Sequence, residues 1–392
     1  MELTANYVGK LERGLIRWPG KLYREALRAI LGVPTDAALG FINARRTVVR
    51  LTNVNRKQFI RGTALGVGTL TLGPLATLLE GSEPSPVPVR VGATEIEQIR
   101  AAARVFESWD STYGGGLGRD AVLAQLRWSA SLLDATCPAR LRAELFSAVG
   151  DLADLTAFMA FDAYAHDEAR RVFRFALGCA EQADDWHLRA QALGNMALQM
   201  IWTGRPDEGL TLIEHALVRA DRLTPTERAM LHTYHGRALA KMRRVRETLI
   251  AVGTVDDHFA HSTPANDPPF MDYYNTATHA QCTGHALFDL AMQGRDPAEA
   301  TDRLAAAVAE HSAGYARSRA ISQTKLASLT MATGDPVEAA AIGTAALDAA
   351  GIIRSRRATD DLRELAWHCT RHSKVDEVDA LRQRITTTLL AS

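Results

Sequence analysis

From about residue 93 to the end of the chain, apolar positions recur at intervals of three and four residues, which is the period of an α-helix. Acidic residues recur within this pattern, each at the start of a helix rich in small residues. They are Glu168, Glu208, Glu247, Glu299, Glu338 and Glu377, at spacings of 40, 39, 52, 39 and 39 residues. A period near 40 is typical of stacked helical hairpins. The pattern therefore predicts an all-α fold, with an α-solenoid of about six helical hairpins.

The turns between these predicted helices carry residues that end one helix and begin the next. Glycines are expected at helix C-termini, where a left-handed conformation costs them nothing, and prolines in the first turn of the following helix. The glycines are Gly204, Gly294 and Gly334, and the prolines are Pro206, Pro297 and Pro336. The one long interval contains Pro264, Pro268 and Pro269, which predict a non-helical insertion at residues 261–269.

A small or apolar residue recurs in the first helix of each later unit. These residues are Ala197, Gly236, Phe288, Ala327 and Ala366, and the spacing around the first and last resembles that of tetratricopeptide repeats. The first helices of such repeats form the inner surface of a superhelix. Counting from the aligned positions places five candidate ligand-binding residues on that surface: Asn195, Tyr234, Arg237, His285 and Lys325. Their amide, aromatic and cationic groups suit a peptide, a small molecule or a protein effector, although each could equally be a solvated helix position.

Several shorter helices are expected before the repeats. An amphipathic helix is predicted from Tyr23 to Leu31, because Gly32 and Pro34 end it. Two further helices are predicted at residues 94–111 and 119–133. They are separated by Gly114-Gly115-Gly116, which we interpret as a turn, since no Gly-Lys-Ser/Thr follows to make a phosphate-binding loop.

The charges are unevenly distributed along a chain whose formal net charge is zero. Residues 1–61 hold 12 Lys and Arg against 4 Asp and Glu, which leaves 33 against 41 in the rest of the 392 residues. A basic region of this kind suits contact with phosphates, because neutralising them supplies most sequence-independent affinity for DNA. Basic surfaces also serve solubility, so both interpretations stay open.

The beginning of the chain, from Thr4 to Gly14, resembles the recognition helix and exit turn of a repressor-type helix-turn-helix. Val8 and Leu11 share one face of this predicted helix, whereas the polar side chains lie elsewhere. Asparagine can read adenine, and lysine or arginine can read guanine or hold phosphate. The candidate DNA-binding residues are Thr4, Asn6, Lys10 and Arg13. An ordinary exposed helix is the alternative.

The segment from Gly62 to Leu79 is uncharged and follows Arg56-Lys57, which resembles an imperfect twin-arginine export signal. It carries four Thr and four Gly, whereas a membrane span needs about 20 strongly apolar residues. We therefore expect a segment packed on the protein body rather than a membrane span.

The chain shows no pattern that predicts catalysis, a cofactor or a metal site. Its four cysteines are far apart, which favours a reducing compartment and no structural zinc. Because no cleavable signal occupies the first 30 residues, we expect a cytoplasmic protein. His232 and His235 would share one helical face, with His258 and His261 further along, but a metal needs a converging third and fourth ligand. Surface histidines on repeat helices explain them equally well.

The run from Asn6 to Gly14, with Arg17-Trp18-Pro19 and Tyr23 to Arg28 behind it, resembles the second half of a Cro/C1-type (XRE-type) domain of actinobacterial regulators. The resemblance extends through Gly114-Gly115-Gly116 and residues 159–171 to the stacked helices. It implies a transcriptional regulator with a tetratricopeptide-like sensing or dimerising part. Since the first two helices of such a domain would precede Met1, we expect a chain truncated at its N-terminus.

The leading hypothesis is an XRE-type regulator that binds DNA if its helix-turn-helix is completed, that binds an effector in the solenoid, and that could form a homodimer. The expected domains are a partial helix-turn-helix at 1–33, a connector with an apolar segment and Pro-rich linker at 34–92, and repeats at 93–392. The rival hypothesis is an interaction scaffold without DNA binding, because the first helices are missing. A third is a membrane-tethered sensor that uses residues 62–79.

Overall fold

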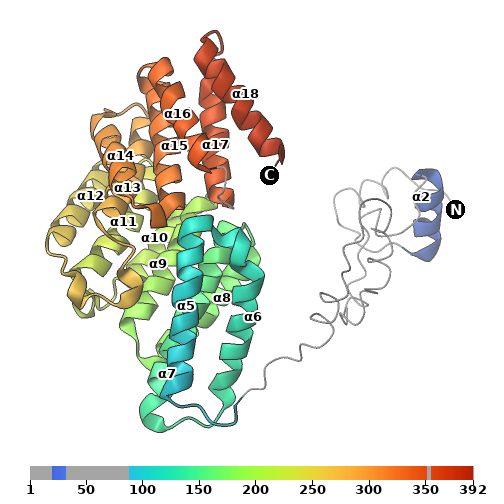
Figure 1. The fold of residues 1–392 in the computed structure, drawn as a ribbon, viewed down its shortest axis with the longest axis vertical. Coiled ribbons are helices and arrows are strands. Elements are labelled where there is room, and N and C mark those ends of the chain that lie inside the picture. The colour runs from blue at the N-terminus through green and yellow to red at the C-terminus, as the bar shows by residue number, and fades with distance from the viewer. Residues whose placement is uncertain (1–19, 32–87, 351–354, 392) are drawn as a thin grey trace, which may run out of the picture. The chain divides into compact units, whose positions relative to one another are not determined.

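A computed structural model describes residues 20–31, 88–350 and 355–391 of the chain (Figure 1). The chain divides into two compact units, Met1–Glu83 and Pro84–Ser392. In the first unit, the described residues form helix α2 (Lys21–Leu31), which begins two residues before the predicted helix. Its last turn carries Arg28, which complements the negative end of the helix dipole.

The second unit consists of α-helices joined by short turns and 3₁₀ segments. The α-helices are α5 (Ala93–Tyr113), α6 (Gly115–Ser131), α7 (Ala139–Asp162), α8 (His166–Ala183), α9 (Trp186–Trp202), α10 (Pro206–Ala216), α11 (Pro225–Lys241), α12 (Val245–Ala260), α13 (Thr276–Ala291), α14 (Ala298–Glu310), α15 (Ala316–Thr333), α16 (Pro336–Ala350), α17 (Arg356–Cys369) and α18 (Asp376–Ala391). A single bridge joins Arg90 to Thr136, and the described residues form no β-strand. The predicted all-α fold class is confirmed.

Consecutive helices of this unit pack on one another in pairs. The pairs are α7 with α8, α9 with α10, α11 with α12, α13 with α14, α15 with α16 and α17 with α18 (Figure 1). The first helix of each pair also packs against the first helix of the next, from α7 through α17. Helix α5 contacts both α15 and the 3₁₀ segment Ala313–Tyr315, which lie about 200 residues later in the chain.

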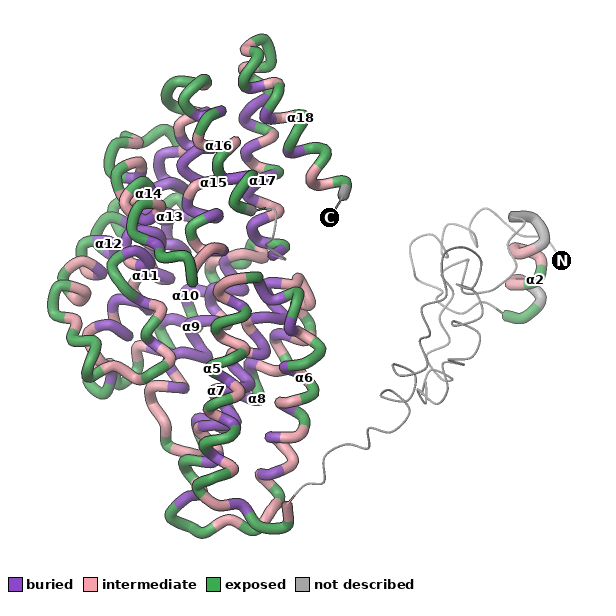
Figure 2. Tube along the Cα trace, in the orientation of Figure 1, coloured by how far each residue is buried: buried purple, intermediate pink, exposed green. Residues whose placement is uncertain are grey.

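Burial separates the two helices of a pair (Figure 2). Twelve of the 17 residues of α11 are buried, against four of the 16 residues of its partner α12. Helices α9 and α13 resemble α11 in this respect, whereas their partners α10 and α14 bury only one face. The first helices are therefore interior elements.

The turn chemistry agrees largely with the sequence prediction. All six periodic glutamates lie in the first turn of their helices, where a negative charge complements the helix dipole. Gly204 and Gly294 have φ of 78° and 91°, the left-handed conformation expected. Gly334 is the C-cap of α15, as predicted, but its φ of −127° is not left-handed. Pro206 and Pro336 begin their helices, whereas Pro297 immediately precedes α14.

The predicted three-glycine turn is shorter than expected. Only Gly114, with φ 84°, separates α5 from α6, because Gly115 already belongs to α6. A Cβ atom at Gly115 would lie 2.4 Å from the carbonyl oxygen of Met159 on α7. Gly115 thus permits a close approach of two helices, a role that only the three-dimensional packing reveals.

The proline-rich insertion at residues 261–269 avoids α-helix, as predicted. It forms two 3₁₀ segments, Pro264–Asn266 and Pro269–Met271. The residues that follow it, up to the start of α13 at Thr276, carry Phe270 and Tyr273 into contact with the buried cluster of the neighbouring helices.

Candidate functional site

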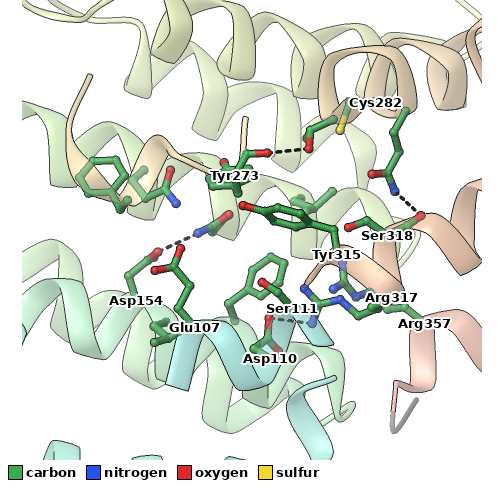
Figure 3. A pocket seen from close by; sticks show the side chains of 18 of the residues that line it. Glu107, Asp110, Ser111, Asp154, Tyr273, Cys282, Tyr315, Arg317, Ser318 and Arg357 are labelled. Carbon is green, nitrogen blue, oxygen red and sulfur yellow. Dashed lines mark hydrogen bonds and ion pairs between the residues drawn. The ribbon is translucent and has the colours of Figure 1, made fainter. Parts of the chain in front are cut away.

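A cavity of ≈ 170 Å³ lies among the first helices (Figure 3). This volume is far above the ~10–15 Å³ that one water molecule requires. Helices α5, α7, α9, α11, α13 and α15 supply most of its lining, and the residues between the insertion and α13 add Phe270 and Tyr273. The lining residues follow helical spacing, as in Gln191, Asn195, Leu198 and Trp202. Each helix therefore presents a single face to the cavity.

Four of the five predicted ligand-binding residues line this cavity, namely Asn195, Tyr234, Arg237 and His285. The fifth, Lys325, lines a second cavity of ≈ 220 Å³. Arg237 and His285 line both cavities and so lie where the two adjoin. All five side chains belong to residues less than a tenth exposed, so none is the solvated helix position that the sequence left open.

Arg237 has no charged partner. Its residue is 9% exposed, and within the described residues it forms no ion pair; its Nε atom has no hydrogen-bond partner. His285 faces the same region, and its Nε2 atom also has no partner. Burial lowers the pKa of His285 well below its ordinary value, and the nearby Arg237 and Lys325 lower it further. His285 is therefore neutral at physiological pH, and Arg237 supplies the free positive charge.

Three carboxyl groups on α5 and α7 line the first cavity without an ion pair among the described residues, and sequence reasoning missed them. Burial raises the pKa of Asp154 to about 8, that of Glu107 to about 7 and that of Asp151 to about 6. Asp154 Oδ2 accepts a hydrogen bond of 2.8 Å from Asn195 Nδ2, whereas its Oδ1 has no partner. The helical spacing of Asp151 and Asp154 was a usable signal. It went unused because the alignment of repeats began only after α7.

A group of buried ion pairs borders the cavity on its opposite side (Figure 3). Arg317 lies 2.7 Å from Asp110, and Arg357 Nε lies 2.7 Å from Oδ1 of Asp162. Burial alone would raise the pKa of Asp162, but Arg357 and Arg317 outweigh it and hold the pKa below its ordinary value. Asp162 also accepts hydrogen bonds from Ser355 Oγ and from the Gly115 backbone N–H. These arginines are neutralised by the protein itself.

Lys325 is likewise neutralised by neighbouring groups. Its Nζ lies 2.9 Å from Asp361, also bonds Glu364, and sits 4.6 Å from the ring centroid of Phe288. The pKa of Lys325 is raised, because the two carboxylates outweigh the effect of burial. The charge of Lys325 is therefore occupied, in contrast with that of Arg237.

Cys282 is the cysteine of the first cavity, and its chemistry favours binding over nucleophilic attack. Burial raises the pKa of the Cys282 thiol to about 11, so it is protonated at neutral pH. Burial likewise raises the pKa of Tyr234 and Tyr273. The arrangement can provide hydrogen bonds, aromatic contacts and one unpaired cation.

The histidine pair of α11 is stacked with a third histidine. The ring centroids of His232 and His235 are 6.0 Å apart, and His258 stacks on His232 at 5.3 Å. Burial lowers the pKa of His232 to about 4. Among the described residues, no group of three or more His, Cys, Asp or Glu is arranged to hold a metal ion.

Other sequence predictions fall outside the described residues. These are the candidate DNA-binding residues Thr4, Asn6, Lys10 and Arg13 and the apolar segment 62–79. In the part of the chain that is described, no helix has the length and apolar character needed to cross a membrane.

Comparison of the chain with protein-family models, with curated proteins and with solved structures gives no match.

Proposed function

We propose that the protein is a transcriptional regulator whose helical unit binds an effector in the cavity among α5, α7, α9, α11, α13 and α15. The N-terminal region, with its excess of basic residues, addresses DNA. The observation that carries the effector site is a set of buried polar atoms that face internal space without partners, including atoms of Asp154, Gln191, Arg237 and His285. Such atoms are costly in a folded protein unless a ligand or water satisfies them.

The helical unit is proposed to be a tetratricopeptide-like α-solenoid of six pairs, from α7 and α8 to α17 and α18. Two observations support this architecture: each first helix packs on the next first helix, and the first helices carry the most buried residues. In such an array the inner surface is built from equivalent faces of successive repeats. A ligand in the cavity would therefore contact several repeats at once and couple their positions.

The DNA-binding part of the proposal rests on the sequence pattern at Thr4, Asn6, Lys10 and Arg13. We expect double substitution of Lys10→Ala with Arg13→Ala to weaken binding to a selected DNA fragment. If both residues neutralise phosphates, the slope of log K against log salt should flatten by about 1.8. Fluorescence anisotropy over a salt series measures this slope.

A matched control removes two positive charges elsewhere. Arg371 and Lys374 are exposed and belong to the segment before α18. Arg371→Ala with Lys374→Ala should leave the slope unchanged. Equal slopes for both double variants would refute the assignment of DNA contact to the N-terminal residues.

The second candidate function is a protein-interaction scaffold that does not bind DNA. It is favoured by an exposed apolar stripe on α5, formed by Val105, Trp109 and Tyr113 at helical spacing. The same salt series separates the two functions, because a scaffold should show no DNA affinity that depends on Lys10 and Arg13.

A further inference from the structure

The first cavity contains ionisable groups of both types, cationic and acidic, that form no ion pair within the described residues. On the cationic side, three arginines line it, but two of them are paired: Arg317 with Asp110, and Arg357 with Asp162. Within each pair, the carboxylate balances the charge of the arginine. Arg237 is left over as a buried guanidinium that forms no ion pair among the described residues, which is an unfavourable state in a protein interior. Burial raises the pKa of Asp361 and the charge of Arg237 helps to lower it, but the two groups are not within ion-pair distance.

On the anionic side, Glu107, Asp151 and Asp154 form no ion pair within the described residues, although all three line the cavity. Their raised pKa values have burial as the main cause, and mutual repulsion among carboxylates adds to it. A positive charge placed beside them would favour their ionised form. These carboxyl groups thus provide a place for a cation that the protein itself does not supply.

The two unpaired sets differ in the cavities that they line. Arg237 and His285 also line the second cavity, whereas the three carboxyl groups line the first cavity alone. Figure 3 shows Glu107 and Asp154 on one side of the space and the paired arginines on the other, with the ring of Tyr315 between them. Six aromatic rings also line the cavity. They belong to Phe158, Trp202, Tyr234, Phe270, Tyr273 and Tyr315.

We infer that this cavity binds a small zwitterionic molecule with an apolar middle. Its anionic group pairs with Arg237, its cationic group lies against Glu107 and Asp154, and its apolar part packs on the aromatic rings. The inference rests on the proposed role of the cavity as the effector site. A zwitterion fits better than a simple anion or cation, because it satisfies both unpaired sets and brings no net charge into a buried space.

A dipeptide with blocked or free ends tests this chemistry directly. The probe is glycyl-phenylalanine in four forms: free, N-acetylated, C-amidated and blocked at both ends. At neutral pH the free form carries an ammonium and a carboxylate. Isothermal titration calorimetry on the full chain should show that each single block raises Kd about tenfold or more, since each removes one charge-assisted contact.

Substitutions assign each end of the probe to its residues. Arg237→Met should make the free and amidated forms bind equally, and Glu107→Gln with Asp154→Asn should make the free and acetylated forms bind equally. Arg189→Met is the matched control, because Arg189 lies outside the cavity and bonds the carbonyl of His215. The Arg189→Met control should still bind the free form more tightly than the amidated and the acetylated forms.

The blocked probes on the unsubstituted protein keep the inference testable even if a variant fails to fold. Equal affinity for all four forms, or no binding of the free form at its solubility limit, would overturn it. The DNA salt series is measured on the same protein. If the protein binds DNA normally but does not bind the dipeptide, only the zwitterionic ligand class is contradicted. If it binds the dipeptide but substitution of Lys10 and Arg13 does not change the salt slope, the regulator function is contradicted.

Discussion

Two buried aspartates on helix α7 should respond to the same substitution in opposite ways. Asp154 and Asp162 are both almost completely buried, at 4% and 0% exposure. Asp154 has one amide partner, Asn195, whereas Asp162 faces two arginines. We predict that Asp154→Asn stabilises the fold at neutral pH and that Asp162→Asn destabilises it.

The magnitude for Asp154 follows from its pKa. The folded-state pKa of about 8 lies above the ordinary value for an aspartate. Between about pH 4 and pH 8 the folded state therefore holds a proton that the unfolded state has lost. The free energy of unfolding falls by about 1.4 kcal/mol per pH unit as pH rises through this window. Asparagine has no such dependence, so the advantage of Asp154→Asn should reach several kcal/mol near pH 7 and vanish near pH 4.

The stability contribution of Asp162 depends on pH in the opposite direction. Its pKa is lowered, so its contribution to stability is present above the unfolded-state pKa and is lost as pH falls through the folded-state pKa. Asp162→Asn leaves Arg357 and Arg317 with a neutral partner. Removing one member of a buried ion pair costs about 3–5 kcal/mol.

Urea unfolding followed by circular dichroism measures both variants, in buffers from about pH 5 to about pH 8 where Asp154 titrates. The unsubstituted protein should lose stability with rising pH more steeply than Asp154→Asn. A shift of the unfolding midpoint in the same direction for both variants would contradict the opposite roles of the two aspartates. An effect of Asp154→Asn that does not depend on pH would contradict the raised pKa of Asp154.

Two further predictions concern packing and the second cavity. Gly115→Ala should destabilise the fold by about 1–3 kcal/mol or more, because its Cβ would lie 2.4 Å from the Met159 carbonyl oxygen. Gly178→Ala should stabilise the fold by about 0.5–1 kcal/mol, because Gly178 lies in mid-helix with open space around it. Equal melting temperatures for the two variants would contradict the close approach at Gly115. Lys325→Met should cost about 3–5 kcal/mol by leaving Asp361 without its 2.9 Å partner, as judged from the urea midpoint, and an unchanged midpoint would show that the pair is dispensable.

The helical architecture could be predicted because its determinants are local. Apolar spacing, an acid in the first turn and a proline at the start act within a few residues, and the structure places all six periodic glutamates at helix starts. Gly334 ends α15 as predicted, but its conformation is not left-handed, because a helix can end without a left-handed residue.

The cavity could be predicted only in part. Counting along repeats placed Asn195, Tyr234 and Arg237 on the inner face, since equivalent positions of repeats face the same way. The count could not show that Arg237 is unpaired and Lys325 is paired, because partners come from other helices. Nor could it reach the carboxyl groups of α5 and α7, which precede the aligned units.

The buried pairing of Asp162 with Ser355 and Arg357 bears on how the protein is made. The partners are separated by 193 and 195 residues along the chain. At ribosomal rates of about 5–20 residues per second, Asp162 is synthesised about 10–40 s before its partners exist. Asp162, at the end of α7, therefore lacks these two partners while the intervening helices form. Final closure is then a late step of folding, and it is a point at which a chaperone or a bound ligand would have time to act.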